Sequence, residues 1–156
     1  MLATKAVTVF YVAANGTQNA LRKWLSEVRG ILVTDRGKQF GFWAMDRRQI
    51  CLAHLVRKFA SYASRQGQAG KIGNGLLLWT GIVLHRWHQV RDGTMSRAEF
   101  RTRIAPVRDA IEGLLEAGAA VPGIAGSCSD ILAHRAALWT FVDEWGVDPT
   151  NNHAPS

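Results

Sequence analysis

The sequence has little cysteine and no long apolar run. Only Cys51 and Cys128 occur among 156 residues, and two cysteines do not make the disulfide framework of a small secreted domain. The most apolar stretch, residues 76–84, is far shorter than the ~20 residues that span a bilayer. The first five residues lack the charged and apolar regions of a signal peptide. We therefore expect a cytoplasmic protein without a membrane partner.

Acidic residues are missing from a long central stretch. Between Arg47 and Arg91 the sequence contains eight Lys or Arg and no Asp or Glu, and the formal net charge of the chain is +7. Such a cluster favours a polyanionic partner, with nucleic acid ahead of an anionic membrane. The alternative is a solvated helix surface whose acidic partners lie elsewhere in the fold. The candidate DNA-binding residues are Arg47, Arg48, Arg57, Lys58, Arg65 and Lys71.

Several motifs of common enzyme classes are also missing. The sequence contains no glycine-rich phosphate loop of the P-loop kind and no serine nucleophile elbow. Gly73 and Gly75 form a Gly-x-Gly pair, but the third glycine and the preceding strand of a dinucleotide site are absent. These absences argue against P-loop, dinucleotide-binding and serine-hydrolase functions.

The apolar residues that are present, 47% of the chain, suffice for a packed core. Residues 6–13 are rich in β-branched and aromatic side chains and predict a strand. Thr17 can cap a helix that Gly30 ends, and residues 31–34 predict the next strand. In such a strand–helix–strand unit the two strands should be parallel. Residues 49–53 are a candidate third strand.

The rest of the chain is expected to be helical. Residues 54–66 and 72–90 predict two helices with a glycine-rich break at residues 67–70. A capping box at Ser96 begins another helix, in which Pro106 should introduce a kink or a split. A last amphipathic helix follows after a loop. The composition thus changes from α/β before about residue 66 to all-α after it.

Asp35 is the leading candidate for chemistry. It follows the short apolar strand 31–34, and ligands of α/β proteins bind just outside the carboxyl ends of such strands. Mg²⁺ prefers oxygen ligands and takes only one or two protein carboxylates together with substrate phosphates. The alternative is that Asp35 only begins a turn or caps a helix. The strand predicted at residues 6–13 supplies no second carboxylate.

Cys51 and His54 have a Cys-x-x-His spacing that could supply two zinc ligands. A structural zinc site needs four ligands, and Cys128 and His134 are the residues that could complete it. No short spacing supports that combination, so zinc is not expected. The alternative interpretation has Cys51 as a small buried residue and His54 as an ordering side chain at a strand–helix junction.

Three segments of the chain carry a resemblance to a known family. They are VTDRG at residues 33–37, RRQICLAHLVRKF at 47–59 and ALWTFVDEWGVDPTNNHA at 137–154. Together with the helical stretch between them, they resemble the insertion-sequence-66 (IS-66) family of bacterial transposases over nearly the whole chain. The most specific patterns are Gln-x-Cys-x-Ala-His-Leu-x-Arg-x-Phe at 49–59 and Pro-Thr-Asn-Asn-x-Ala at 149–154.

The resemblance implies an RNase H-like catalytic fold of the DDE type, carrying a large all-α insertion. In that family three carboxylates bind two Mg²⁺ (or Mn²⁺) ions and drive DNA strand cleavage and transfer. Asp35 matches the second Asp of the triad. Cys51 and His54 match a motif that helps to shape the catalytic core. The implied division is a partial RNase H-like core at residues 1–66, a helical insertion at 67–145 and a tail at 146–156.

The chain departs from the family pattern at two of the three acids. The first Asp of the family precedes the region where this sequence begins, and its Glu falls at the position of Pro155. We therefore expect a truncated or frameshifted transposase whose tail leads to a missing catalytic Glu helix. A single carboxylate does not support two-metal catalysis, so the chain is expected to be inactive alone.

Two further hypotheses remain open. A non-catalytic chain could bind transposon ends, or pair with full-length transposase or with itself, and regulate transposition. Alternatively, the chain is an active nuclease that combines Asp35 with Asp46, Asp143 or Glu144.

Overall fold

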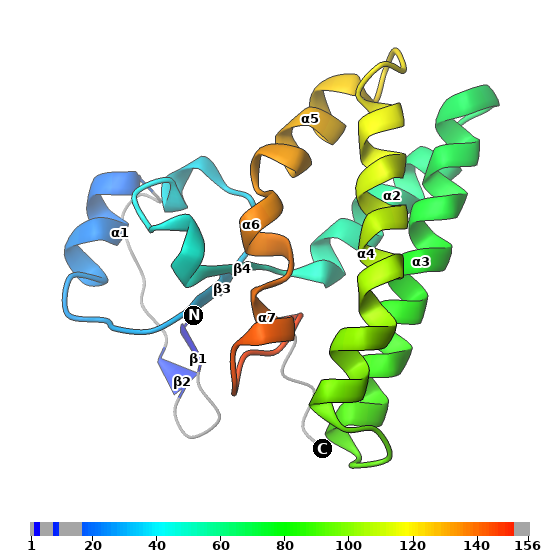
Figure 1. Ribbon diagram of the computed structural model, residues 1–156. Coiled ribbons are helices and arrows are strands. Elements are labelled where there is room, and N and C mark those ends of the chain that lie inside the picture. Colours follow the sequence, from blue (N-terminus) through cyan, green and yellow to red (C-terminus); the bar gives the residue numbers. More distant parts are fainter. Residues whose placement is uncertain (1, 4–7, 10–16, 152–156) are drawn as a thin grey trace.

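The computed structural model describes residues 2–3, 8–9 and 17–151. Within them, small strands and one short helix lie on one side of the molecule, and a layer of long helices forms the other (Figure 1). The helix α1 (Gln18–Trp24) begins as predicted, because the Thr17 hydroxyl accepts a hydrogen bond from the amide of Ala20. It ends earlier than expected, and Gly30 follows several residues later in a left-handed conformation (φ 114°).

Two separate pairs of strands are formed by the described residues. β1 (Leu2–Ala3) and β2 (Thr8–Val9) are antiparallel, and β3 (Leu32–Thr34) and β4 (Arg48–Ile50) are parallel. The strand predicted at residues 6–13 lies largely outside the described residues, and its described part pairs with β1. β3 pairs in parallel with β4, which overlaps the third strand predicted at residues 49–53. Two 3-10 turns, η1 (Lys38–Phe40) and η2 (Met45–Arg47), connect β3 to β4.

Six helices follow β4 within residues 52–151. The first three are long: α2 (Leu52–Ala63), α3 (Gly67–Arg91) and α4 (Arg97–Gly118). The last three are shorter: α5 (Ala125–Ala133), α6 (Arg135–Leu138) and α7 (Thr140–Asp143). α3 packs against both α2 and α4, while α6 and α7 contact β4 and α7 contacts α4. The last three helices thus join the parallel strand pair to the long helices.

The helix boundaries correct three sequence predictions. The break expected at residues 67–70 is instead the first turn of α3. Pro106 lies inside an unbroken α4, which Ser96 caps through the amide of Glu99. The single last helix is divided into α5, α6 and α7. A Cβ added at Gly70 would lie 2.0 Å from the carbonyl oxygen of Arg65, and one added at Gly73 would lie 2.2 Å from the amide nitrogen of Ala63, so both glycines permit close packing of the chain.

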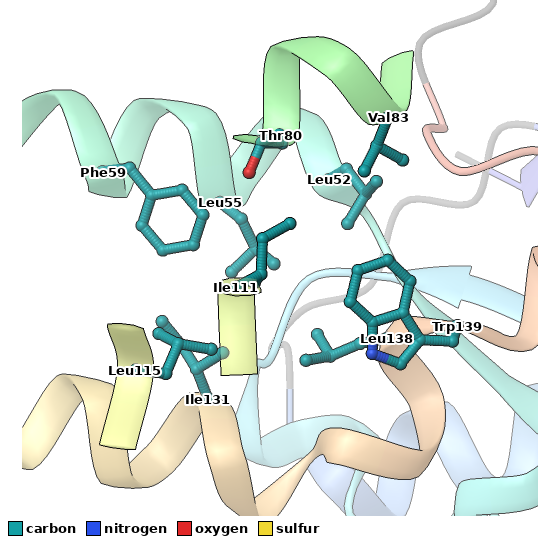
Figure 2. Close-up of a pocket in the computed structure, with 10 residues that line it drawn as sticks. All are labelled: Leu52, Leu55, Phe59, Thr80, Val83, Ile111, Leu115, Ile131, Leu138 and Trp139. Atoms are coloured by element: carbon teal, nitrogen blue, oxygen red, sulfur yellow. The ribbon is translucent and has the colours of Figure 1, made fainter. Parts of the chain in front are cut away.

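One hydrophobic core runs through β4 and helices α2 to α7. At one end Trp87 makes edge contacts with Phe100 and Phe141, with ring centroids 5.6 and 5.2 Å apart. Near the centre a cavity of about 10 Å³ remains between side chains of five helices, α2 to α6, and Trp139 (Figure 2). That volume holds no more than about one water molecule, so the core is closely packed. The core crosses the boundary expected at residue 66, and the domain division remains a prediction.

None of the described helices is both long and apolar enough to cross a bilayer.

Candidate metal and nucleic-acid site

Asp35 directly follows β3 and is partly buried. Its Oδ1 accepts a hydrogen bond from the amide of Gly37 (2.8 Å), and its carbonyl accepts one from the Thr34 hydroxyl (2.8 Å). The bond from the Gly37 amide forms the turn that was predicted from the sequence as the alternative role of Asp35. Oδ2 has no hydrogen-bond partner among the described residues. Asp35 therefore begins a turn and still presents one free carboxylate oxygen.

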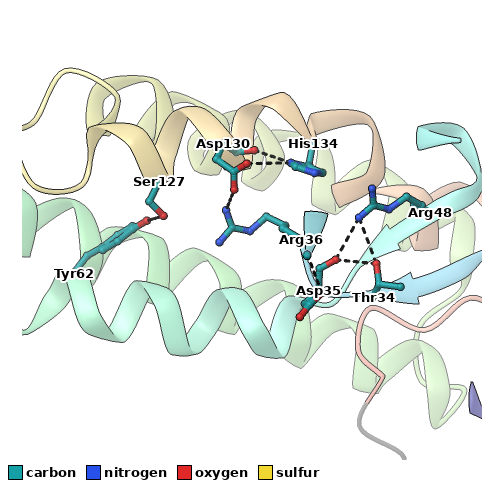
Figure 3. A network of polar contacts seen from close by, with 9 residues as sticks. Thr34, Asp35, Arg36, Arg48, Tyr62, Ser127, Asp130 and His134 are labelled. Carbon is teal, nitrogen blue, oxygen red and sulfur yellow. Dashed lines mark hydrogen bonds and ion pairs between the residues drawn. The ribbon is translucent and has the colours of Figure 1, made fainter. Parts of the chain in front are cut away.

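Arg48, the first residue of β4, contacts the backbone of Asp35. Its side chain is 2% exposed, and Nη2 approaches the carbonyl of Asp35 (3.3 Å) and the Thr34 hydroxyl (3.5 Å) (Figure 3). Burial lowers the pKa of Arg48 while the charge of Asp35 raises it. All three residues of β4 are buried, because helices and loops cover both faces of the short strand. This burial argues against the expected contact between Arg48 and DNA.

A groove of about 470 Å³ opens beside Asp35. The end of β3, one face of α2 and the residue Asp130 of α5 form its walls. Its charged lining consists of two carboxylates, Asp35 and Asp130, and three cations, Arg36, Arg57 and Lys58. His54 also borders the groove, and its Nδ1 is buried without a hydrogen-bond partner among the described residues. The groove is therefore a surface of mixed charge, with a small excess of cations, beside a free carboxylate oxygen.

Asp130 is held by Arg36 across this groove. Figure 3 shows the Arg36 guanidinium directed at the Asp130 carboxylate, with His134 on the other side of that carboxylate. The Arg36 side chain is 18% exposed, whereas that of Asp130 is 53% exposed. His134 Nδ1 lies 2.7 Å from the Asp130 carbonyl oxygen and 3.9 Å from its carboxylate. The largely buried cation thus depends on an acid that stands half in water.

Cys51 joins the two most specific sequence patterns. It is fully buried, and its amide donates to the carbonyl of Thr34 (2.7 Å). Its thiol donates to the side-chain oxygen of Asn151 (3.0 Å), whose own amide donates to the sulfur (3.4 Å). The amide of Leu52 donates to the carbonyl of Pro149 (2.8 Å). Segments 100 residues apart therefore meet beside the end of β3, next to Asp35.

The four residues considered for zinc are not brought together. Cys51 contacts Asn151, whereas Cys128 is buried on α5 close to Gly118. Burial raises the pKa of the Cys128 thiol. In the described part of the chain, no group of three or more His, Cys, Asp or Glu is placed to hold a metal ion.

The other predicted DNA-binding residues are spread over the surface. Arg47 stacks over the ring of Trp43, with its Cζ 6.0 Å from the centroid, and the indole of Trp43 donates to the Arg47 carbonyl. Arg65 donates to the carbonyl of Gly123 (2.7 Å). Lys71 is exposed on α3. Of the six cations, only Arg57 and Lys58 line the groove with Asp35.

The acids of the nuclease hypothesis lie away from the groove. Asp46 is exposed in η2, and Asp143 pairs with Arg101 (3.5 Å) at the end of α7, beside exposed Glu144. None of the three lines the groove with Asp35.

Sequence reasoning missed Arg36 and Asp130. Arg36 could have been noticed because it directly follows Asp35. Asp130 gave no local signal, since 94 residues separate it from its partner.

The comparisons with known proteins give one match. The model of a family described as Transposase IS66 family matches residues 2–155. No curated protein and no solved structure matches the chain. The family match spans nearly the whole sequence, including both patterns that meet at Cys51. The chain therefore belongs to the IS66 family of transposases.

Proposed function

We propose that this chain forms part of a DDE-type catalytic region that acts on DNA, with Asp35 as one of its metal-binding carboxylates. The observation that carries the proposal is the position of Asp35 at the carboxyl end of a parallel strand, facing a groove that contains Arg57 and Lys58. The parallel pair β3–β4 is consistent with the part of an RNase H-like sheet that would lie next to the site. The tie between Cys51 and Asn151 places the two sequence patterns beside it.

The donor atoms fit one position of a Mg²⁺ or Mn²⁺ site. Asp35 offers a hard carboxylate oxygen, while Gly37 fixes the other oxygen and so orients the group. Mg²⁺ is commonly held by one or two carboxylates together with substrate phosphates. Held by the Asp35 carboxylate, such an ion would supply positive charge to stabilise a phosphodiester that undergoes cleavage. Arg57 and Lys58 would bind and orient the DNA backbone, and buried Arg48 would keep the end of β3 in place.

The same donor set supports the proposal that the 156-residue chain does not catalyse strand transfer alone. Asp130 is the other acid that lines the groove, and it is committed to Arg36. Two-metal phosphoryl transfer needs carboxylates that share both ions, and Asp35 by itself offers one. Efficient Mg²⁺-dependent strand transfer by this chain in isolation would contradict this part of the proposal.

The alternative function is non-catalytic DNA binding that regulates full-length transposase. It draws support from the cationic groove, which can hold a phosphate backbone whether or not chemistry follows. Pairing with a full-length copy or with itself would be the route of regulation.

DNA binding is expected to be salt-dependent and to require the groove. Arg57→Gln and Lys58→Gln should each weaken binding to a short duplex and reduce the slope of log affinity against log salt by about one. Fluorescence anisotropy across a salt series measures both quantities. Arg91→Gln removes the same charge at the far end of α3 and is the matched control. Binding that is absent, or that does not change with salt, would contradict both functions.

A further inference from the structure

Arg36 is a cation whose surroundings require an anion. Its side chain is largely removed from water, and its carboxylate partner comes from a distant helix and remains half exposed. Exposed ion pairs contribute little to stability because solvent competes with them. Water can therefore replace Arg36 around the Asp130 carboxylate at low cost in free energy. The buried Arg36 guanidinium, by contrast, needs another anion if Asp130 leaves.

Arg57 and Lys58 face the same space from α2. They precede Ser61 by about one helical turn, and all three line the groove together with Asp35 and Arg36. The Ser61 hydroxyl donates its hydrogen bond to the carbonyl of Lys58 (2.7 Å) within α2, so we do not count it among the groups that bind a ligand. The cationic groups available for an incoming anion are thus one from the end of β3 and two from α2.

We propose that Arg36, Arg57 and Lys58 form a phosphate-binding subsite for the DNA backbone, in which the Asp130 carboxylate occupies Arg36 until a DNA phosphate displaces it. The inference rests on the proposed function and deepens it. It adds Arg36 as a DNA contact and assigns to α5 the role of an electrostatic gate over the groove.

The proposed exchange replaces one anion on Arg36, the Asp130 carboxylate, with another, a DNA phosphate. Carboxylate and phosphate oxygens both accept two parallel hydrogen bonds from the planar guanidinium fork, so a phosphate can replace Asp130 on Arg36 without movement of the cation. Asp130, once displaced, stays close to His134, which directly follows α5. Three cations face two carboxylates in the groove while Asp130 is in place, and this near balance holds DNA affinity down.

Removing the gate should strengthen DNA binding. Asp130→Asn leaves three cations against one carboxylate and frees Arg36, so the affinity of the chain for a short duplex should rise on the order of 5-fold at low salt. The slope of log affinity against log salt should stay close to that of the unaltered chain, because the two complexes make the same phosphate contacts once Asp130 is displaced. Asp130→Ala should behave alike, and thermal melting followed by circular dichroism checks that both variants are folded.

Two controls separate the gate from a general charge effect. Asp109→Asn removes one exposed carboxylate from α4 and should change affinity much less. In an Arg36→Gln background, Asp130→Asn should lose most of its effect, because the cation that it frees is gone. Inorganic phosphate should compete with DNA more strongly for Asp130→Asn than for the unaltered chain.

The outcomes distinguish this inference from the proposed function. If the unaltered chain binds DNA and Asp130→Asn matches Asp109→Asn, the gate is wrong and the proposed function stands. An equal effect of Asp130→Asn with and without Arg36 also overturns the gate. If neither the unaltered chain nor Asp130→Asn binds DNA, the proposed function and the gate fail together.

Discussion

Replacing Gln49 with alanine is expected to lower the free energy of unfolding by about 3 kcal/mol. Gln49 is fully buried in β4, and its side-chain amide donates to the carbonyls of Ile50 (2.7 Å) and Leu138 (3.0 Å). Its side-chain oxygen accepts from the amide of Phe141 (2.9 Å). The substitution would leave buried backbone groups of α6 and α7 unpaired and open a cavity. Urea denaturation followed by circular dichroism measures the loss.

Two companion variants test the reason for this loss. Gln49→Met keeps most of the side-chain volume and removes the hydrogen bonds, so it should still cost about 2 kcal/mol. Gln68→Ala changes an exposed glutamine near the start of α3 and should stay within about 0.5 kcal/mol of the unaltered chain. A Gln49→Met variant as stable as the original chain would show that packing, and not the buried amide, joins the strand pair to the last helices.

Gly73→Ala is expected to destabilise the chain by about 3 kcal/mol, at the upper end of the cost of overpacking. A Cβ at this position would lie 2.2 Å from the amide nitrogen of Ala63 and 2.6 Å from the carbonyl carbon of Tyr62. Both atoms belong to the backbone of α2, so no side-chain rotation relieves the clash. α2 and α3 would have to separate, and the core between them would loosen. Thermal and urea unfolding measure the effect.

Gly81→Ala on the same helix provides the matched control. Apart from the neighbouring backbone of α3 itself, no atom lies within 4 Å of the Cβ that this substitution adds, and the position is exposed. Alanine has the higher helix propensity, so the variant should be as stable as the original or more stable by up to about 1 kcal/mol. Equal destabilisation by Gly73→Ala and Gly81→Ala would contradict the close approach of α2 and α3.

Local sequence patterns predicted the elements whose causes are local. Thr17 and Ser96 cap their helices because a hydroxyl reaches an amide three residues on. Gly70 was misinterpreted as part of a chain break because a glycine required by close packing resembles one that ends a helix. Pro106 was expected to kink or divide its helix, and the helix is not divided there. Long-range packing decided these positions.

In the site, as in the fold, local features were predicted from the sequence and long-range contacts were not. Asp35 was predicted as a site residue from its position after an apolar strand, which is a local signal. The burial of Arg48 depends on the helices that cover β4, and the pairing of Arg36 with Asp130 joins residues 94 positions apart. No spacing rule within one element could predict either contact. The family resemblance supplied Cys51 and Asn151 as parts of two patterns, and their mutual contact is a property of the fold.

The central claim is that Asp35 binds a divalent metal ion in the groove, and Mn²⁺ titration of the ¹⁵N-labelled chain tests it most directly by NMR. Bound Mn²⁺ should broaden the amide signals of Gly37 and His54, which lie beside Asp35. Asp35→Asn keeps the bond from the Gly37 amide but removes the charge, and it should abolish this broadening. Asp109→Asn should leave the broadening unchanged. Broadening that persists in Asp35→Asn, or that never concentrates at the groove, would contradict the claim.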